Sequence, residues 1–552
     1  MAGGGAGGTD VMSGGKGACG GLPGGARLDP VEGHNPRSGS APRAGIIDIA
    51  VAIPWRRLSA AAIAAAWGGR GGRGRRAVAS YDEDSITLAV AAALECLDER
   101  AAEELGALYF ASVSAPYIEK SCATIVASAL DLGGMLRTAD FGGSLRAGSS
   151  ALAAALDAVD AGGVETALVA AADCRIAPPG SSLEAVLGDG GAAVLVGREE
   201  PIAIPLASAY IPHNIMDLWR TDEQRSLRSG DTRFGRVEAY AKYAVAASKE
   251  AMKRAGTGPR EISRAVLPSP DGRGHGAVAR ELGLRPESVV DPGAEELGVL
   301  GTAHPFLMLE SALQASERGE RILFTACGDG CDAIIFEATA SVEAFRKRRR
   351  RAAPAVEIGY VKYLAFKKLL AEGPEEGRPF SSPIQMSREE GLSLRLRAKK
   401  CKACATINTL NLRVCPHCGR RDDFDEVKLT RRGVLHTYTQ EHYYPTPEPP
   451  VTMAVVDLEG GGRYLAQMTD VEPSEVRIGM EVELTFRRLH EGGGYHNYCW
   501  KCRPVRRTGG EGAGAERAAA SDTSQITSKG AGGGGGEVGA GGKISGGGSR
   551  WA

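Results

Sequence analysis

Two Cys-x-x-Cys pairs constrain the folding of this 552-residue chain more than any other feature of its sequence. The pairs are Cys401 with Cys404 and Cys415 with Cys418, separated by ten residues. Four thiolates at this spacing can close a tetrahedron around one Zn²⁺ ion, with no coordination position left for water. The spacing therefore predicts a structural zinc ribbon of the rubredoxin type over 401–420, although a reduced thiol cluster without metal stays an alternative. Metal binding of about 10 kcal/mol or more would help to fold so small a module.

Five short β-rich stretches follow the ribbon. They are Gly433–Tyr438, Val451–Leu458, Arg463–Val471, Glu481–Arg488 and His496–Pro504. Five short strands of this kind predict a small OB-type β-barrel over 421–505. Cys499 and Cys502 form a third Cys-x-x-Cys, but in a strand this spacing points the two side chains to opposite faces, so we do not assign them to metal.

The larger part of the chain, 45–342, alternates strand-like and helix-like segments. The predicted strands are Ile46–Ile53, Ala107–Val113, Thr166–Ala172, Ala192–Val196, Arg264–Leu267, Arg321–Ala326 and Ala333–Ala338. The predicted helices are Asp84–Leu97, Ser121–Leu130, Ala147–Ala161, Arg236–Ala255, Gly276–Leu282 and His304–Ala315. Alternation of this kind favours α/β layers. A helix, a glycine turn and a strand near residue 155 recur about 157 residues later, and Gly-Asp-Gly occurs twice, which indicates a duplicated domain.

Composition and charge limit the remaining possibilities. Of 76 glycines, 30 lie in 1–44 and 506–552, two stretches without periodic apolar residues that we predict to be disordered. No segment has the roughly 18 apolar residues of a membrane span. The twelve cysteines without an export signal favour a reducing cytoplasm. A net charge of −1 gives no overall positive field that would attract nucleic acid.

The basic run 346–351 lies near the start of a predicted basic, helical linker over 343–400. We interpret the run as solvated charge, with phosphate binding as the alternative.

Six short motifs, taken in their order and spacing, resemble the thiolase superfamily. They are Asp82–Thr87, Leu145–Ser149, Gly188–Ala193, Asp217–Arg220, Pro268–Arg273 and Cys327–Gly330. Within that superfamily, 45–342 is most similar to the hydroxymethylglutaryl-CoA synthase-like branch, which is related to ketoacyl synthase III. The ribbon and barrel resemble the acyl-CoA-associated partner proteins of such enzymes. The resemblance implies an α/β fold with a duplicated thiolase-like αβαβα domain, an acyl-CoA ligand and a homodimer formed through the large domain.

The resemblance also implies three catalytic positions, and none carries the expected side chain here. A Cys thiolate at a helix N-terminus would accept the acyl group, a Glu would act as acid and base, and a His would orient the second thioester. The matching residues are Leu145, Val113 and Pro268. None of the three can ionise.

Other residues could have taken over these roles. Ser144 adjoins the nucleophile position, while His304 and Cys327 lie in segments that look like the late His and Cys motifs of true thiolases. We interpret His304 more readily as a packed helix-start residue and Cys327 as a buried strand thiol. The resemblance also places Leu145, Asp271, Gly328 and Gly330 near the acyl group as candidate substrate-binding residues, although glycines at strand ends often only permit tight turns.

Two functional hypotheses follow from these residues. The first is an acyl-CoA-binding scaffold that channels intermediates for a separate thiolase. The alternative is an active acyltransferase that performs a Claisen-type condensation of acyl-CoA thioesters with non-standard residues. The resembled barrel family is not used for nucleic acid, so a nucleic-acid-binding protein ranks below both.

Overall fold

The computed structural model describes residues 43–348, 355–370, 381–444 and 446–505. The tails predicted to be disordered lie outside these residues, except for Arg43 and Ala44. Ala44 is buried, and its backbone N–H donates to the Asp160 carboxylate at 2.7 Å, so the folded domain already includes this residue. Within the described part of the chain, no helix is long and apolar enough to cross a membrane.

The central sheet of the large domain is built twice from the same pattern. Its nine strands run in the order β11-β12-β13-β8-β1-β7-β6-β4-β5. In each half a parallel pair (β4 with β6, β11 with β12) is followed by two antiparallel neighbours (β7 and β1, β13 and β8). The halves meet through a bridge between β1 and β8. The predicted duplication is therefore confirmed by the topology. The strands are β1 (Gly45–Ala52), β4 (Leu105–Ala111), β5 (Arg137–Phe141), β6 (Thr166–Asp173), β7 (Gly190–Gly197), β8 (Ala203–Pro212), β11 (Ile262–Val266), β12 (Arg321–Cys327) and β13 (Gly330–Ala338).

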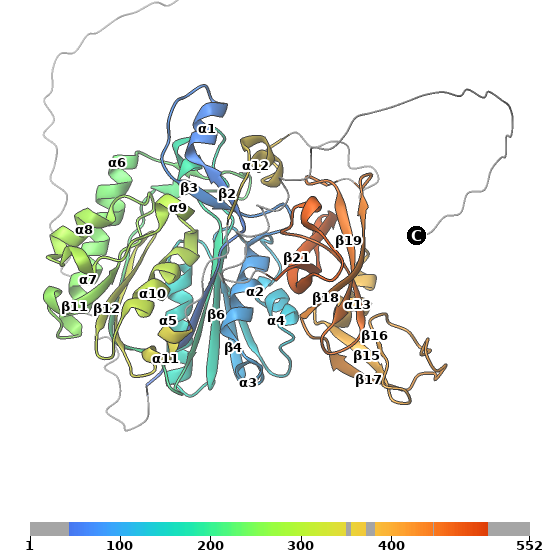
Figure 1. The fold of residues 1–552 in the computed structure, drawn as a ribbon. Coiled ribbons are helices and arrows are strands. Elements are labelled where there is room, and N and C mark those ends of the chain that lie inside the picture. The colour runs from blue at the N-terminus through green and yellow to red at the C-terminus, as the bar shows by residue number, and fades with distance from the viewer. Residues whose placement is uncertain (1–42, 349–354, 371–380, 445, 506–552) are drawn as a thin grey trace, which may run out of the picture. The chain divides into compact units, whose positions relative to one another are not determined.

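Helices form three layers with the sheet halves between them (Figure 1). α5 (Ala147–Asp160) and α10 (His304–Ala315) share one buried core with both halves. α2 (Ser85–Cys96) and α4 (Cys122–Ala129) cover the first half, and α7 (Lys242–Arg254) and α8 (His275–Leu282) cover the second. This arrangement is the αβαβα architecture that the sequence predicted.

Most predicted elements are present, and the exceptions have physical reasons. The polar strand β5 lies at the edge of the sheet, and three of its five residues are exposed. Its sequence therefore lacks the alternating hydrophobic pattern of a buried strand. β8 contains two prolines, which disfavour a strand prediction. The predicted helix 236–255 begins as a π-helical turn, Gly235–Ala241, ahead of α7.

The large domain also contains several short strands and helices outside the central sheet. A three-stranded sheet contains β2 (Arg56–Ser59), β3 (Arg75–Val78) and β14 (Val356–Glu357), and α12 (Tyr360–Phe366) packs against it. The others are α1 (Ala60–Ala66), α3 (Glu99–Glu103), β9 (Leu218–Trp219), β10 (Arg228–Ser229), α6 (Thr232–Phe234), α9 (Ala294–Leu297) and α11 (Val342–Lys347).

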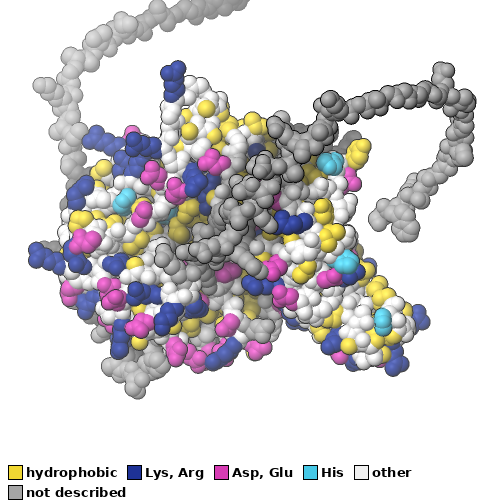
Figure 2. Space-filling model, in the orientation of Figure 1, with side chains coloured by type: hydrophobic (Ala, Val, Ile, Leu, Met, Phe, Trp, Pro, Cys, Tyr) yellow, Lys and Arg dark blue, Asp and Glu magenta, His cyan; other side chains and the backbone are white. Residues whose placement is uncertain are grey.

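The basic run 346–351 begins at the end of α11. Arg348 Nη1 lies 3.0 Å from the Asp48 carboxylate, and Arg346 Nη1 lies 4.0 Å from the Glu317 carboxylate. Residues 349–351 lie outside the described residues. On the face drawn in Figure 2, basic and acidic side chains are interspersed, in keeping with the net charge of −1. Two of the described residues of the run, Arg346 and Arg348, therefore pair with acids of their own domain.

The ribbon and barrel follow α13 (Pro383–Ser393). β15 (Arg397–Cys401), β16 (Ile407–Asn408) and β17 (Phe424–Lys428) form the ribbon sheet, which extends beyond the predicted bounds 401–420 on both sides because strands flank the Cys pairs. All five predicted barrel strands are present and run in the order β20-β19-β18-β21-β22. They are β18 (Arg432–Glu441), β19 (Val451–Leu458), β20 (Arg463–Gln467), β21 (Glu481–Gly492) and β22 (Tyr495–Pro504).

Candidate acyl-CoA site

A cavity of about 680 Å³ lies where the ends of β4 and β6, the start of α5 and the barrel meet. The large domain lines it with Val113, Ser144, Leu145 and Gly328, and the barrel contributes Arg488, Glu491 and His496. The cavity thus collects most of the matched catalytic region in one place. The contribution of the barrel was not predicted, since nothing in β21 or β22 marks a side chain as part of a site.

Leu145 and Ser144 occupy the start of α5 beside the turn after β12. The Ser144 hydroxyl donates to the Gly328 carbonyl at 2.8 Å, and Arg146 Nε donates to the same oxygen at 2.8 Å. A Cβ on Gly328 would lie 2.9 Å from Leu145 Cβ, so only glycine permits this close approach. The proton of Ser144 is therefore held by a backbone carbonyl, which cannot act as a general base.

The buried Asp173 carboxylate fixes the backbone around Val113. It accepts hydrogen bonds from five donors, at 2.7–2.9 Å: the hydroxyls of Ser112, Ser114 and Thr302, and the backbone N–H groups of Val113 and Thr302. Because so many donors converge on one buried carboxylate, the position of Val113 at the cavity wall is set by the fold.

The structure separates His304 and Cys327 from the residues that line the cavity. His304 is 1% exposed at the start of α10, and its Nδ1 accepts from the Leu300 N–H at 3.4 Å. Cys327 is buried in the β12–β13 hairpin, with its Sγ 2.6 Å from that of Cys331. Gly330, with φ +106°, forms the same hairpin turn, and any Cβ there would lie 1.9 Å from the Ile211 carbonyl. These positions fit the packing and turn interpretations.

Asp271 belongs to a second, smaller cavity of about 60 Å³, which Ser269 also lines. Burial raises the pKa of Asp271, but hydrogen bonds from Ser269, the Arg273 backbone and Arg236 outweigh it and hold the pKa below its usual range. Asp217 and Leu218 line both cavities and so separate them. Pro268, the matched position of the family His, does not line the larger cavity.

Burial of His304 predicts an acid-dependent loss of stability. Burial and, second, the charge of Arg175 lower the His304 pKa from 6.5 to about 4. Between these values the unfolded chain binds a proton that the folded chain refuses, so stability is lost as the pH falls from 6.5 to 4. We expect the wild type to lose about 3 kcal/mol more than His304→Gln between pH 7 and pH 4. Denaturant unfolding of both proteins across this range measures the difference, and parallel curves would contradict the assignment.

The four cysteines of the ribbon come together as a set that could hold a metal ion. Their Sγ atoms all lie within 4.8 Å of one another, and the Cys401–Cys418 and Cys404–Cys415 pairs are 3.6 Å apart. A Zn–S bond of about 2.3 Å implies tetrahedral edges of about 3.8 Å, so the spacing fits zinc. Gly419, with φ +73°, makes the turn after the second pair. Cys499 and Cys502 lie in β22, outside this cluster.

Buried charges join the barrel to the large domain beside the cavity. Arg487 of β21 lies 3.0 Å from Glu83 and 2.8 Å from Asp470, and Lys501 of β22 lies 2.9 Å from Asp82. The side chains of these residues are at most 3% exposed. Residues 82–84 lead into α2, whose N-terminus favours negative charge. The outer faces of β21 and β22 are therefore an interface within the chain and not a solvated surface.

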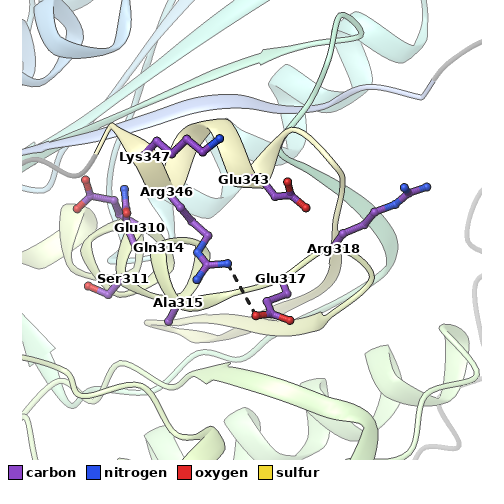
Figure 3. Close-up of a pocket in the computed structure, with 9 residues that line it drawn as sticks. All are labelled: Glu310, Ser311, Gln314, Ala315, Glu317, Arg318, Glu343, Arg346 and Lys347. Carbon is purple, nitrogen blue, oxygen red and sulfur yellow. Dashed lines mark ion pairs between the residues drawn. The ribbon is translucent and has the colours of Figure 1, made fainter.

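A separate groove lies between α10 and α11 (Figure 3). Its volume is about 1050 Å³, and mixed charges line it, among them Glu310, Glu317 and Arg346. None of the residues predicted for the acyl site lines this groove. This groove therefore carries no catalytic assignment.

Comparisons with known proteins match the large domain and the barrel separately. A family model described as the ChsH2 C-terminal OB-fold domain matches residues 426–487. Hydroxymethylglutaryl-CoA synthase of Methanopyrus kandleri is 32% identical over 349 residues, which cover 59% of this chain and 98% of that protein. The synthase of Methanocaldococcus jannaschii is 30% identical over 350 residues, covering 59% and 99%.

Solved structures support the fold. A crystal structure of an HMG-CoA synthase complexed with CoA has a TM-score of 0.53 at 19% identity, covering 62% of this chain and 94% of that one. The HMG synthase of the curacin biosynthetic pathway, in complex with an acetyl donor-ACP, has a TM-score of 0.51 at 19% identity, covering 59% and 88%. With nearly whole archaeal synthases matched at 30% identity or more, the chain belongs to the hydroxymethylglutaryl-CoA synthase family.

Proposed function

We propose that this protein binds an acyl-CoA thioester in the 680 Å³ cavity without forming an acyl-enzyme at residue 145. The observation that carries the proposal is Leu145, an aliphatic side chain at the cavity wall where the resembled enzymes place their thiolate. The relatives are named for a reaction of CoA thioesters, which supports the ligand class. Val113 and Pro268 leave the other two matched positions without an ionisable group. The expected role is that of a scaffold that holds or passes on an acyl-CoA intermediate.

Labelling and calorimetry together test this proposal. Purified protein is incubated with radiolabelled acetyl-CoA and acetoacetyl-CoA, and binding is measured in parallel by titration calorimetry. We expect saturable binding without protein-bound label or condensed product. Label that disappears in Ser144→Ala or Cys327→Ala would instead establish the acyltransferase alternative. Absence of any CoA thioester binding would overturn both the scaffold and the acyltransferase hypothesis.

We also propose that the ribbon holds a structural Zn²⁺, bound by Cys401, Cys404, Cys415 and Cys418. The fit of the sulfur spacing to zinc supports this assignment. Four thiolates around the ion would leave it no catalytic role, so it would hold β15–β17 together. Thiolate ligands must stay reduced, and the cytoplasm is the compartment that suits this proposal.

A homodimer through the large domain is part of the proposal. Among the described strands, β5 ends the sheet with nothing paired on its outer side. Met135, two residues before β5, is 101% exposed, and Ile118 is 88% exposed. An open edge flanked by exposed apolar side chains favours pairing with a second copy. Sedimentation should give a dimer that Met135→Arg dissociates, whereas Tyr443→Arg, equally exposed on the barrel, should leave it intact. A monomeric wild type would refute it.

A separate thiolase remains a proposed partner. The outer faces of β21 and β22 are buried against the large domain, so such a partner would have to dock on another surface. Gel filtration of the protein mixed with a purified thiolase from the same organism tests this, and separate elution at micromolar concentration would count against it.

A further inference from the structure

Two cysteines face each other across the hairpin that joins β12 to β13. Cys327 ends β12, and its partner in the strand register is Cys331, the second residue of β13. Directly opposite residues of an antiparallel pair have Cα atoms about 4.5–5.5 Å apart, and a disulfide needs about 4.4–6.8 Å. The Cys327 S–H donates to Cys331 Sγ at 2.6 Å, whereas the sulfur pairs of the ribbon are 3.6 Å apart. The backbone therefore already places the two thiols where a bond between them requires no rearrangement of the strands.

The pair is buried but lies next to the cavity of about 680 Å³. Cys327 is 7% exposed and Cys331 is 0% exposed. Gly328 and Asp329, which follow Cys327 in the turn, both line the cavity. A reagent of the size of water that enters the cavity therefore comes within one residue of Cys327, while a bulky disulfide does not fit into the hairpin. This setting favours a small oxidant of the peroxide class.

The surroundings of the two thiols give them different roles. Burial raises the pKa of Cys331 well above its usual value, and Cys327 and the charge of Asp332 raise it further. The Cys331 S–H donates to the Asp332 carbonyl at 3.5 Å. Cys331 therefore stays protonated and is a poor first target for an oxidant. The slightly exposed Cys327 is the thiol that an oxidant meets first.

The hairpin also holds the start of α5. The Gly328 carbonyl accepts the hydrogen bonds from Ser144 and Arg146 described above. Asp332, next to Cys331, accepts from Arg146 Nη1 at 2.7 Å and from the Ser149 hydroxyl at 2.6 Å. Contacts to α5 thus lie on both sides of the cysteine pair. A covalent bond within the pair would fix the turn and, through it, this wall of the cavity.

We propose that Cys327 and Cys331 form a reversible disulfide that locks this wall. Hydrogen peroxide oxidises the Cys327 thiol to a sulfenic acid, and one water is released. The Cys331 sulfur then attacks the sulfenic sulfur, so that the S–S bond forms, the S–O bond breaks, and the hydroxyl leaves with the Cys331 proton as a second water. A dithiol reductant restores both thiols. The bond forms only where oxidant is present, which is compatible with a reducing compartment, and it does not depend on the ligand of the cavity.

Peptide mass analysis of the full-length protein tests this proposal. Trypsin cuts after Arg321 and Arg346 and nowhere between them, so both cysteines lie in the peptide 322–346. Reduced protein is treated with hydrogen peroxide, denatured, alkylated with iodoacetamide and digested. We expect this peptide to carry no alkyl group and to be two hydrogens lighter, and dithiothreitol before alkylation should restore two alkyl groups. In Cys331→Ser, Cys327 should stop at the sulfenic acid, which dimedone traps.

Hydrogen exchange tests the lock. In the oxidised wild type, exchange of the amides at the start of α5 should slow by about 10-fold or more, because the closed turn opens less often. The same treatment should leave the exchange of Cys331→Ser unchanged. A disulfide that forms without slowing this exchange would overturn the lock.

Cys122→Ser is the matched control, because Cys122 is equally buried but lies outside the hairpin, at the start of α4. It should still give the lighter peptide after peroxide treatment. A wild-type peptide that keeps both alkyl groups, or that gains oxygen instead of losing two hydrogens, overturns the disulfide. Loss of the lighter peptide in Cys122→Ser would contradict the pairing of Cys327 with Cys331. Because the mass change is measured on the wild type, the result does not depend on whether a variant folds.

Discussion

Cys415→Ser is expected to lose the zinc ion that we propose and to unfold the ribbon, the largest single effect that we predict for this protein. The three remaining thiolates cannot close the tetrahedron, and the ribbon sheet β15–β17 has little apolar core of its own to replace about 10 kcal/mol of metal binding. Released zinc, measured with a chromogenic chelator after denaturation, should fall from one ion per chain to none. Cleavage by protease should appear between residues 397 and 428.

The chain supplies a matched control for this experiment. Cys499 belongs to the third Cys-x-x-Cys, which lies outside the sulfur cluster, so Cys499→Ser should keep one zinc per chain and resist the protease as the wild type does. A wild type that contains no zinc after expression in zinc-supplemented medium would refute the metal assignment. Equal zinc loss in both variants would show that the Cys-x-x-Cys at 499–502 also takes part.

Arg487→Met is expected to destabilise the protein by about 3–5 kcal/mol, because it leaves buried carboxylates without their cation. Glu83 and Asp470 both lie within 3.0 Å of this guanidinium. Arg487→Lys keeps the charge and should cost less. Guanidinium unfolding followed by tryptophan fluorescence measures the change, and the exposed Trp67 and buried Trp500 report on different domains.

The destabilisation caused by Arg487→Met should also depend on pH. Burial raises the pKa of Glu83 to about 7 against the opposing charge of Arg487. Since the folded protein holds this proton better than the unfolded chain, stability falls as the pH rises from 4.5 to 7. Without Arg487 the folded pKa rises further, so the destabilisation should be larger at pH 8 than at pH 6.

The exposed Arg413 is the matched control for Arg487. It pairs with Asp422 at 2.8 Å but is 79% exposed, and solvent screens such a pair, so Arg413→Met should leave the midpoint of unfolding almost unchanged. An Arg487→Met protein as stable as Arg413→Met would show that the buried network contributes little.

Elements that depend on neighbours in sequence were predictable. The periodicity of α10 and the capping residues of α2 mark those helices locally, and all five barrel strands follow from alternating apolar residues. β5 and the π-helical start of α7 were not predictable, because a sheet end and a helical irregularity are decided by what packs beside them. The acyl site was predictable only in part: Ser144, Leu145 and Gly328 do meet at one cavity, while His304 and Cys327 are buried elsewhere.

The sequence by itself determined the four-cysteine cluster, the duplicated α/β pattern and the apolar residues at the matched catalytic positions, because each depends on residue types at short spacing. The tertiary structure alone decided that charged residues of β21 and β22 are buried and that the barrel completes the cavity wall. Asp82 and Lys501 are 419 residues apart. A charged strand position looks solvent-facing until a distant segment covers it.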